Sequence, residues 1–280
     1  MEIKNNVKST VNIGSNTYLL DYSEEFEGKE LSDRWMNNPT YERTVAGKTS
    51  IVDNINTCVS NGVLRVGSSL DENGVYHGGE ILTTDIFSHG YFESRLKVPS
   101  GDGYFPAFWG KMPGTMATEP VNNEIDFFEF YGTDKRHYPG IHTWFVPESD
   151  KLPEWIKNRN KANTDVVKKD QFVFALPYKP VELNDSSIYH IFSCEWTKEK
   201  LAFYLDGNMY FERKFKADGK WVRAGEENYY TALIEGSPIH IYFSNLVGQE
   251  SNKLQPLPKD DNIGQALEVE YFRYYKLAGK

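Results

Sequence analysis

Three carboxylates that could carry out acid–base chemistry lie within six residues, near the middle of this 280-residue chain. They are Glu124, Asp126 and Glu129, in the segment NEIDFFEF. Side chains alternate between the two faces of a strand, so Glu124 and Asp126 share one face. Glu129 breaks the alternation, but one extra residue at Phe127 or Phe128, a β-bulge, returns it to that face. The segment therefore predicts a strand that presents three acids on one side.

Acids this close together are expected to titrate differently from ordinary surface acids. Three neighbouring carboxylates do not all ionise easily, so the pKa of at least one should rise. A carboxylic acid that keeps its proton near neutral pH is suited to general acid catalysis. The alternative is that the acids only solvate one face of a strand, and the segment alone leaves both interpretations open.

The composition favours a β-rich protein and argues against several kinds of partner. The chain has 18 Tyr, 17 Phe and 6 Trp, which suits a β-sheet core or a surface on which sugar rings stack. A net charge of −9 argues against nucleic acid or an anionic membrane as a partner. No apolar stretch approaches the roughly 18 residues of a membrane span. Cys58 and Cys194 permit either one disulfide or two buried free thiols.

Turn residues recur between short alternating segments, a pattern typical of an all-β sandwich. The alternation is clearest over residues 90–98, and residues 151–167 form the one plausible helix or long loop. No linker, repeat or composition shift divides the chain, so we expect one domain. Further strands are expected at residues 63–66, 104–109, 190–196, 201–205, 209–213, 239–243 and 267–275.

These segments, in this order, resemble glycoside hydrolase family 16. Residues 124–129 match the bulged E-x-D-x-x-E signature of its laminarinase-, agarase- and carrageenase-like members. Further blocks match in order between residues 22 and 276: FEGKEL followed by Trp35, GYFESR, PSG through PAFW, EWT with YLDG, and EYFRYY. The resemblance implies an all-β, concanavalin-like β-jelly-roll sandwich of two antiparallel sheets with an open concave cleft. It places a single catalytic domain at residues 22–280, after an N-terminal extension or first strand at residues 1–21.

The resemblance also implies a mechanism. Glu124 is expected to be the nucleophile and Glu129 the acid, and later the base, of a retaining endo-β-glycanase, with Asp126 coupled to both. Retention needs carboxyl groups about 5–5.5 Å apart, whereas the backbone separates Glu124 and Glu129 by roughly 13 Å, so the side chains must lean together. The expected substrate is a β-glucan or galactan with internal β-1,3 or β-1,4 linkages. Alternatives are a non-catalytic, lectin-like glycan-binding module and a transglycosylase on the same scaffold.

Five residues are candidates for substrate binding. Trp109 could stack on a sugar ring, although such a residue could equally belong to the core. His142 could bind substrate or the acid, and Trp144 would share its face. Glu93 and Arg95 are expected near the acid-bearing strand, where they could contact sugar or instead form a cross-strand salt bridge. Two further tryptophans in less regular segments could be sugar platforms: Trp155 and Trp221.

Members of the family often hold a structural calcium, and the resemblance assigns its ligands to Glu25, Gly62 and Glu270. Oxygen ligands suit Ca²⁺, although Glu stands where the family usually has Asp. Catalysis by two carboxylates needs no cofactor, so any calcium is expected to be structural.

The substrate is less defined than the chemistry. Asn122 and Asn123 before Glu124, and the Phe127–Phe128 pair after it, depart from the lichenase and laminarinase patterns. A local excess of basic residues, which would suit a sulfated galactan, could equally be a solvated surface: Lys135, Arg136, Lys157, Arg159, Lys161, Lys168 and Lys169. We expect a monomer that is secreted, periplasmic or at the cell surface, with any signal peptide absent from this chain.

Overall fold

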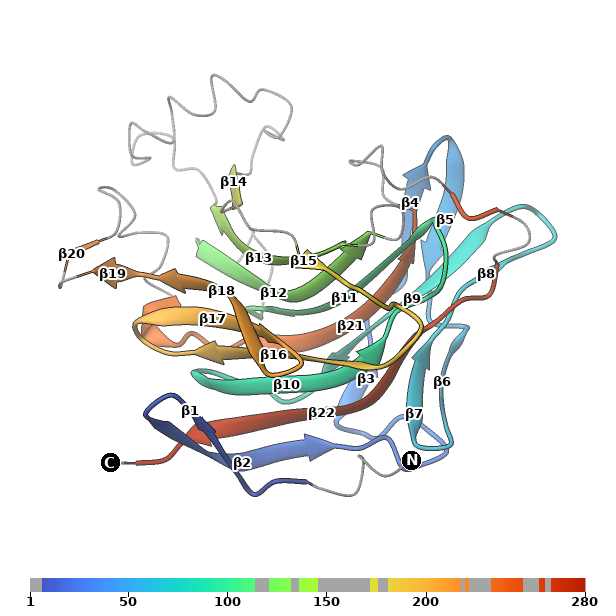
Figure 1. Ribbon diagram of the computed structural model, residues 1–280. Helices are drawn as coiled ribbons and strands as arrows, with labels where there is room; N and C mark the ends of the chain where they lie inside the picture. The colour runs from blue at the N-terminus through green and yellow to red at the C-terminus, as the bar shows by residue number, and fades with distance from the viewer. Residues whose placement is uncertain are drawn as a thin grey trace.

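The chain folds into two β-sheets packed face to face, one of them curled (Figure 1). The structure, a computed structural model, describes residues 7–113, 121–131, 136–145, 172–175, 181–217, 220–221, 233–248, 257–259 and 263–279. For a few of these it describes only the backbone: residues 121, 122, 131, 143–145, 172–175, 217, 220 and 221.

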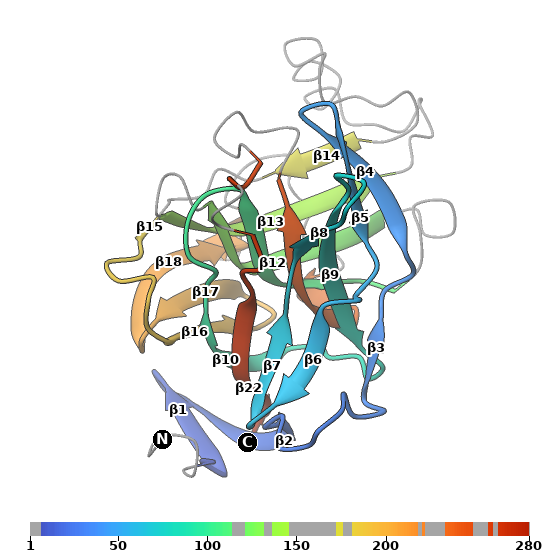
Figure 2. The same cartoon turned by 90° about the vertical axis from the view of Figure 1, so that its right-hand side faces the viewer.

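The smaller sheet contains nine of the described strands. Its main order is β1-β2-β22-β10-β16-β17-β18, with β7 beside β22 and β6 beside β7 (Figure 2). The strands are β1 (Thr10–Ile13), β2 (Asn16–Glu24), β6 (Thr57–Ser60), β7 (Val63–Val66), β10 (Gly90–Lys97), β16 (His190–Trp196), β17 (Lys200–Leu205), β18 (Asn208–Lys214) and β22 (Leu267–Leu277).

The larger sheet contains eleven of the described strands and carries the acid segment. Its main order is β14-β13-β12-β11-β21-β9-β5-β4, with β3 and β8 beside β9 and β15 beside β13. The strands are β3 (Trp35–Asn37), β4 (Tyr41–Val45), β5 (Lys48–Val52), β8 (Ser69–Leu70), β9 (Tyr76–Thr83), β11 (Tyr104–Lys111), β12 (Val121–Tyr131), β13 (Arg136–Phe145), β14 (Phe172–Ala175), β15 (Val181–Glu182) and β21 (His240–Val247). A separate pair consists of β19 (Lys216–Ala217) and β20 (Lys220–Trp221).

Aromatic side chains fill the space between the sheets. Phe92 on β10 stacks on Phe127 on β12, with ring centroids 5.2 Å apart, and Phe108 packs against Phe127 and Phe243 at 4.6 and 5.1 Å. All four are fully buried. Each comes from a strand whose alternate residues point away from the core, so packing these rings fixes which side chains the larger sheet displays on its other face.

The predicted all-β sandwich is confirmed, with two differences. β5 pairs with β9 in parallel, because β5 reaches β9 by a crossover rather than a hairpin, and residues 233–235 form one helical turn. Within the described residues, no helix has the length and apolar character needed to cross a membrane. The expected helix or loop at residues 151–167 lies outside the described residues.

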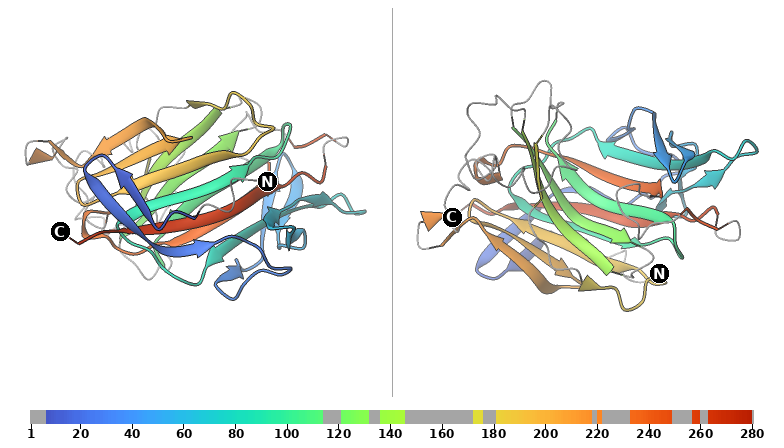
Figure 3. Two further views of the ribbon diagram at one scale, coloured as in Figure 1. Left: turned by 60° about the horizontal axis from the view of Figure 1, so that its bottom comes forward. Right: turned by 90° about the horizontal axis from the view of Figure 1, so that it is seen from above.

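The amino-terminal segment is the edge of the smaller sheet. The predicted boundary at residue 21 falls inside β2, which pairs with β22 from Tyr18 to Glu24 (Figure 3). Tyr18 also donates a hydrogen bond to the buried carboxylate of Glu195, at 2.7 Å. Cys58 and Cys194 are both free thiols, and Cys58 is exposed rather than buried.

Candidate active site

A β-bulge in β12 brings the three acids to one face, as the alternation predicts. Ala107 lies opposite Glu129 and Trp109 lies opposite Asp126, and these partners share a face because they are two residues apart on β11. Phe127 is the extra residue, since the register of β12 shifts between Asp126 and Glu129 against β13. We call the side of the larger sheet that carries Glu124, Asp126 and Glu129 the acid face.

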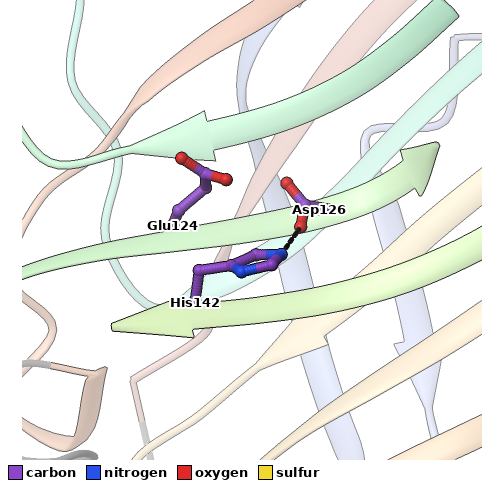
Figure 4. A group of neighbouring side chains, drawn as sticks. All are labelled: Glu124, Asp126 and His142. Carbon is purple, nitrogen blue, oxygen red and sulfur yellow. Dashed lines mark ion pairs between the residues drawn. The ribbon is translucent and has the colours of Figure 1, made fainter. Parts of the chain in front are cut away.

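A histidine from the neighbouring strand lies among the acids. His142 pairs with Glu124 across β12 and β13, and its Nε2 lies 3.0 Å from Oδ2 of Asp126. Figure 4 shows the imidazole reaching from β13 to the Asp126 carboxylate, with Glu124 beside them. One ionisable atom from each of the three lies within 4.8 Å of the others. Glu124, Asp126 and His142 therefore form one electrostatic unit.

A glycine makes room for this arrangement. Gly140 lies directly opposite Asp126, and a Cβ at this position would lie 2.1 Å from Asp126 Oδ2. Any other residue would push the carboxylate aside, because real Cβ atoms do not approach oxygen so closely. The position of Asp126 therefore depends on the absence of a side chain at Gly140.

The acid face raises the pKa of two of its groups, and the shift of Glu129 is in the direction that general acid catalysis requires. Burial, followed by the charges of Asp126 and Glu124, raises the pKa of Glu129 well above that of an ordinary glutamate. Burial alone would lower the pKa of His142, but Asp126, Glu124 and Glu129 outweigh it and raise the pKa to about 10. Glu129 therefore keeps its proton to higher pH than an ordinary glutamate does, and His142 is an imidazolium at neutral pH.

Beyond the acids, the same face carries an aromatic platform. Trp109 stacks on Tyr242 of β21, with ring centroids 4.1 Å apart and planes inclined by 20°. Both rings are partly exposed, and Trp109 donates from Nε1 to Oγ of Ser244 at 3.2 Å. Trp109 is therefore a surface platform and not a core residue. The sequence analysis missed Tyr242, although the alternation of its predicted strand places its side chain on the face away from the core residues Ile241 and Phe243.

Another residue that the sequence analysis missed lies further along the face. Glu80 of β9 is opposite Ser244, which is opposite Ala107, so Glu80 is in line with Glu129 across four strands. It accepts hydrogen bonds from Asn38 Nδ2 at 2.5 Å and Tyr41 Oη at 3.3 Å. Burial raises the pKa of Glu80 to about 7. No spacing in the sequence relates Glu80 to the acids, because only the order of strands in the sheet brings them together.

The structure does not bring Glu93 and Arg95 to the site. Their strand, β10, is near β12 as expected, since Phe92 stacks on Phe127 across the core, but β10 pairs with β16 and β22 in the other sheet. Both side chains are on the outer side of that sheet, where Arg95 forms an ion pair with Glu270 and Glu93 accepts a hydrogen bond from Tyr271. Their cross-strand role is the alternative that the geometry supports.

The proposed calcium ligands do not fit a calcium ion. Glu25 is bound by Nε and Nη2 of Arg273 at 2.8 and 2.9 Å, and Glu270 is paired with Arg95. Gly62 lies in the turn between β6 and β7 with a φ of 73°. A hard cation needs several free oxygen ligands, whereas both carboxylates here already bind a guanidinium.

Several other predicted residues are described only in part or not at all. Trp144 lies on β13 opposite Asn122 and Trp221 ends β20, but their side chains lie outside the described part of the chain, as does all of Trp155. Arg136 begins β13. The remaining residues of the basic segment lie outside the described residues: Lys135, Lys157, Arg159, Lys161, Lys168 and Lys169.

Comparison with known proteins places this arrangement in a family. Residues 41–260 match the family model of glycosyl hydrolases family 16. A glucan endo-1,3-beta-glucosidase A1 of Niallia circulans is 24% identical over 205 residues, which are 72% of this chain and 26% of that protein. The chain thus spans about a quarter of that relative's length.

Solved structures show the same fold. The endo-beta-1,3-glucanase of Pyrococcus furiosus superposes with a TM-score of 0.63 at 22% identity, over 98% of this chain and 100% of that one. One structure comes from work on endo-acting O-glycanases that prominent human gut microbes express to initiate mucin breakdown. It superposes with a TM-score of 0.65 at 17% identity, over 94% and 92% of the two chains. The family match covers most of the chain and includes the bulged strand with its three acids, and on that basis this protein belongs to glycosyl hydrolase family 16.

Proposed function

We propose that this chain is a retaining endo-β-glycanase that hydrolyses internal β-1,3 or β-1,4 linkages of a polysaccharide. One observation carries the proposal: the bulge at Phe127 places Glu124, Asp126 and Glu129 on one face, where their surroundings raise the pKa of Glu129. A protonated acid beside an ionised carboxylate is the pair that glycosidic bond cleavage with retention requires.

The reaction takes two displacements. In the first, a carboxylate oxygen of Glu124 attacks the anomeric carbon while Glu129 donates its proton to the departing glycosidic oxygen. A glycosyl ester on Glu124 results, and the carboxyl of Glu129 is left ionised. In the second, Glu129 takes a proton from water, the water oxygen bonds to the anomeric carbon, and the ester bond to Glu124 breaks. Glu129 ends protonated, ready for another cycle.

The rest of the acid face suits a chain of sugars that runs across the strands. The Trp109–Tyr242 stack offers an apolar surface for the face of a sugar ring. Glu80 lies three strand spacings from Glu129, about 14 Å at 4.8 Å per strand, and holds Asn38 and Tyr41, whose polar atoms can bind hydroxyl groups. Among the similar solved structures are an endo-β-1,3-glucanase and one from work on mucin-degrading O-glycanases, and we propose a β-glucan or galactan as the substrate.

Substitution of the two acids tests the proposal. Glu124→Gln and Glu129→Gln should each lower kcat/KM by about 10²–10⁴-fold, because each removes one proton-transfer or bond-forming group while keeping its shape. Glu93→Gln, on the opposite sheet, is the matched control and should leave kcat/KM within about twofold. If wild type and both variants bind glycan and none releases sugar, the chain is a lectin-like module and the hydrolase proposal fails.

Product analysis addresses substrate and stereochemistry. The panel comprises laminarin, mixed-linkage glucan, agarose, porphyran, carrageenan and mucin-type glycans. Release of oligosaccharides of several lengths from one of them supports endo-cleavage, and products longer than the substrate would indicate a transglycosylase. A proton NMR time course on the active substrate should show the β-anomer first. Initial appearance of the α-anomer would contradict the assignment of Glu124 as nucleophile.

We also propose that the enzyme is a monomer. Light scattering after gel filtration should give the mass of one chain, 32.2 kDa.

We further propose that it acts outside the cytoplasm, because an endo-acting glycanase must meet a polymer too large to enter a cell. Immunodetection in fractionated producing cells should find the protein in the periplasm, at the surface or in the medium.

A further inference from the structure

The imidazole of His142 lies on the acid face and takes no part in the two displacements. Its Nε2 lies 3.0 Å from Asp126 Oδ2, the His142 side chain is 19% exposed, and the Asp126 side chain is 2% exposed. Charges this well buried are little screened by salt. The interaction between His142 and Asp126 is therefore a strong one within the site.

The groups around His142 are predominantly acidic. From β12 it faces Glu124, Asp126 and Glu129, and each of the three favours its charged form. From β11, Lys111 lies opposite Glu124, one strand further away. From β14, the residue paired with His142 is Ala175. His142 thus supplies a positive charge in direct contact with Asp126.

The contact exists because Gly140 has no side chain. Asp126 points across to β13 at Gly140, two residues from His142 on the same face. A Cβ there would displace the carboxylate oxygen that pairs with His142, since the oxygen in contact with His142 and the oxygen that a Cβ would strike are the same Oδ2. The glycine and the ion pair are parts of one arrangement.

We infer that His142 is a permanent imidazolium that offsets the charge of Glu124 and Asp126, and that Gly140 is the positioning residue that lets Asp126 reach it. This inference rests on the proposed hydrolase function, which it deepens. With the cation in place, the negative charges of Glu124 and Asp126 are partly offset by a positive charge from the neighbouring strand. His142 itself neither gives nor takes a proton during the cycle.

The pH dependence of kcat/KM tests the inference. Loss of the positive charge in His142→Gln favours the protonated form of every acid nearby, so the pKa values of both Glu124 and Glu129 should rise. Both limbs of the bell-shaped profile should therefore move to higher pH, by about 1 to 3 units. His190→Gln is the matched control: His190 is also paired with an aspartate, Asp206, at 2.7 Å, but lies on β16 of the other sheet. Its profile should coincide with wild type.

A histidine that only contacts sugar gives a different result. In that case His142→Gln would alter substrate binding, so KM would change while both limbs of the pH profile stay in place. A shift of both limbs by less than about 0.3 pH unit, equivalent to about 0.4 kcal/mol, would overturn the inference.

NMR of the wild-type protein provides a measurement that does not depend on the folding of a variant. The ¹⁵N shifts of the His142 ring, assigned by their absence in His142→Gln, should remain those of an imidazolium from pH 5 to pH 8. Titration of this ring to the neutral form below pH 8 would overturn the inference. Because this readout needs no turnover, it stands even if no glycan in the panel is cleaved, so its failure and failure of the hydrolase proposal are distinguishable.

A pair of glycine variants tests the positioning role. Gly140→Ala should shift the activity profile to higher pH, as His142→Gln does, because both separate the cation from Asp126. Gly110→Ala is the control: its Cβ would meet Ile239 Cδ1 at 2.4 Å on the core side of β11. It should lower stability and leave the limbs of the profile in place. An unshifted profile in Gly140→Ala would contradict the positioning role.

Discussion

The outer faces of the two sheets handle charge in opposite ways. On the smaller sheet, acids are matched with bases: Glu25 with Arg273, Glu270 with Arg95, and Glu195 with Lys200. On the larger sheet, three acids gather around one histidine, and burial together with the charges of Asp126 and Glu124 raises the pKa of Glu129. Paired charges hold strands together, whereas crowded like charges shift pKa values toward the range of catalysis. The contrast separates structural from chemical use of the same residue types.

The largest effect should follow from breaking the crowded face. Asp126→Asn removes the charge that binds His142 and should lower kcat about 10²–10³-fold, because the acids beside it lose their alignment and electrostatic balance. Glu270→Gln breaks an ion pair on the other sheet and should keep kcat within about twofold. Steady-state kinetics on the same substrate compares the two. Equal losses in both variants would remove the distinction between the faces.

Stability should respond in the reverse way. Arg273 is on β22, which lies between β2 and β10. Arg273→Ala leaves Glu25 without its guanidinium and should lower the free energy of unfolding by about 3 kcal/mol. Lys276→Ala, whose ion pair with Asp21 is exposed, should cost no more than about 1 kcal/mol. Urea denaturation measures both. A loss in Arg273→Ala no larger than that in Lys276→Ala would show that the paired face contributes little.

Two histidines of β13 bring the contrast onto a single strand. His137 points into the core among Phe128, Phe192 and Tyr210, and burial lowers its pKa to about 3. Below pH 6.5, His137 binds a proton in the unfolded chain but stays neutral in the native protein. The free energy of unfolding therefore decreases as the pH is lowered. Between pH 6.5 and 5.0 the loss is about 2 kcal/mol.

His137→Phe should abolish that part of the acid dependence, as urea denaturation at several pH values can measure. His142 has the opposite sign, since its raised pKa adds stability that is complete below about pH 6.5 and is lost as pH rises toward 10. An unchanged slope in His137→Phe between pH 5.0 and 6.5 would refute the assignment to His137.

The smallest effect concerns calcium. Because guanidinium groups already bind Glu25 and Glu270, adding millimolar CaCl₂ or EDTA should shift Tm by less than about 1 °C. A structural site filled at 100 times its Kd would instead add about 2.7 kcal/mol and raise Tm by several degrees. Differential scanning calorimetry in the two buffers measures the difference in Tm. A shift of several degrees would support the structural calcium site that the family resemblance implies.

The sequence predicts local patterns well and lateral neighbours poorly. Alternation in residues 90–97 and the parity break at Glu129 follow from the two-residue repeat of a strand, and both appear in the structure. Glu93 and Arg95 were misplaced because alternation shows which residues share a face and says nothing about which sheet the face belongs to. Glu80 and Gly140 were missed for the same reason: strand order and register bring each to the acid face, and neither leaves a local signal.

The bulge at Phe127 also constrains how such a site can arise or be lost. Because it reverses the inward and outward pattern of everything that follows, deleting one of the two phenylalanines would turn Glu129 into the core and Phe130 out of it. Substitutions alone cannot restore that alternation, since a substitution changes a side chain but not the number of residues in the strand. The bulged and unbulged forms of this strand therefore differ by an inserted or deleted residue, and evolution from one form to the other requires that insertion or deletion.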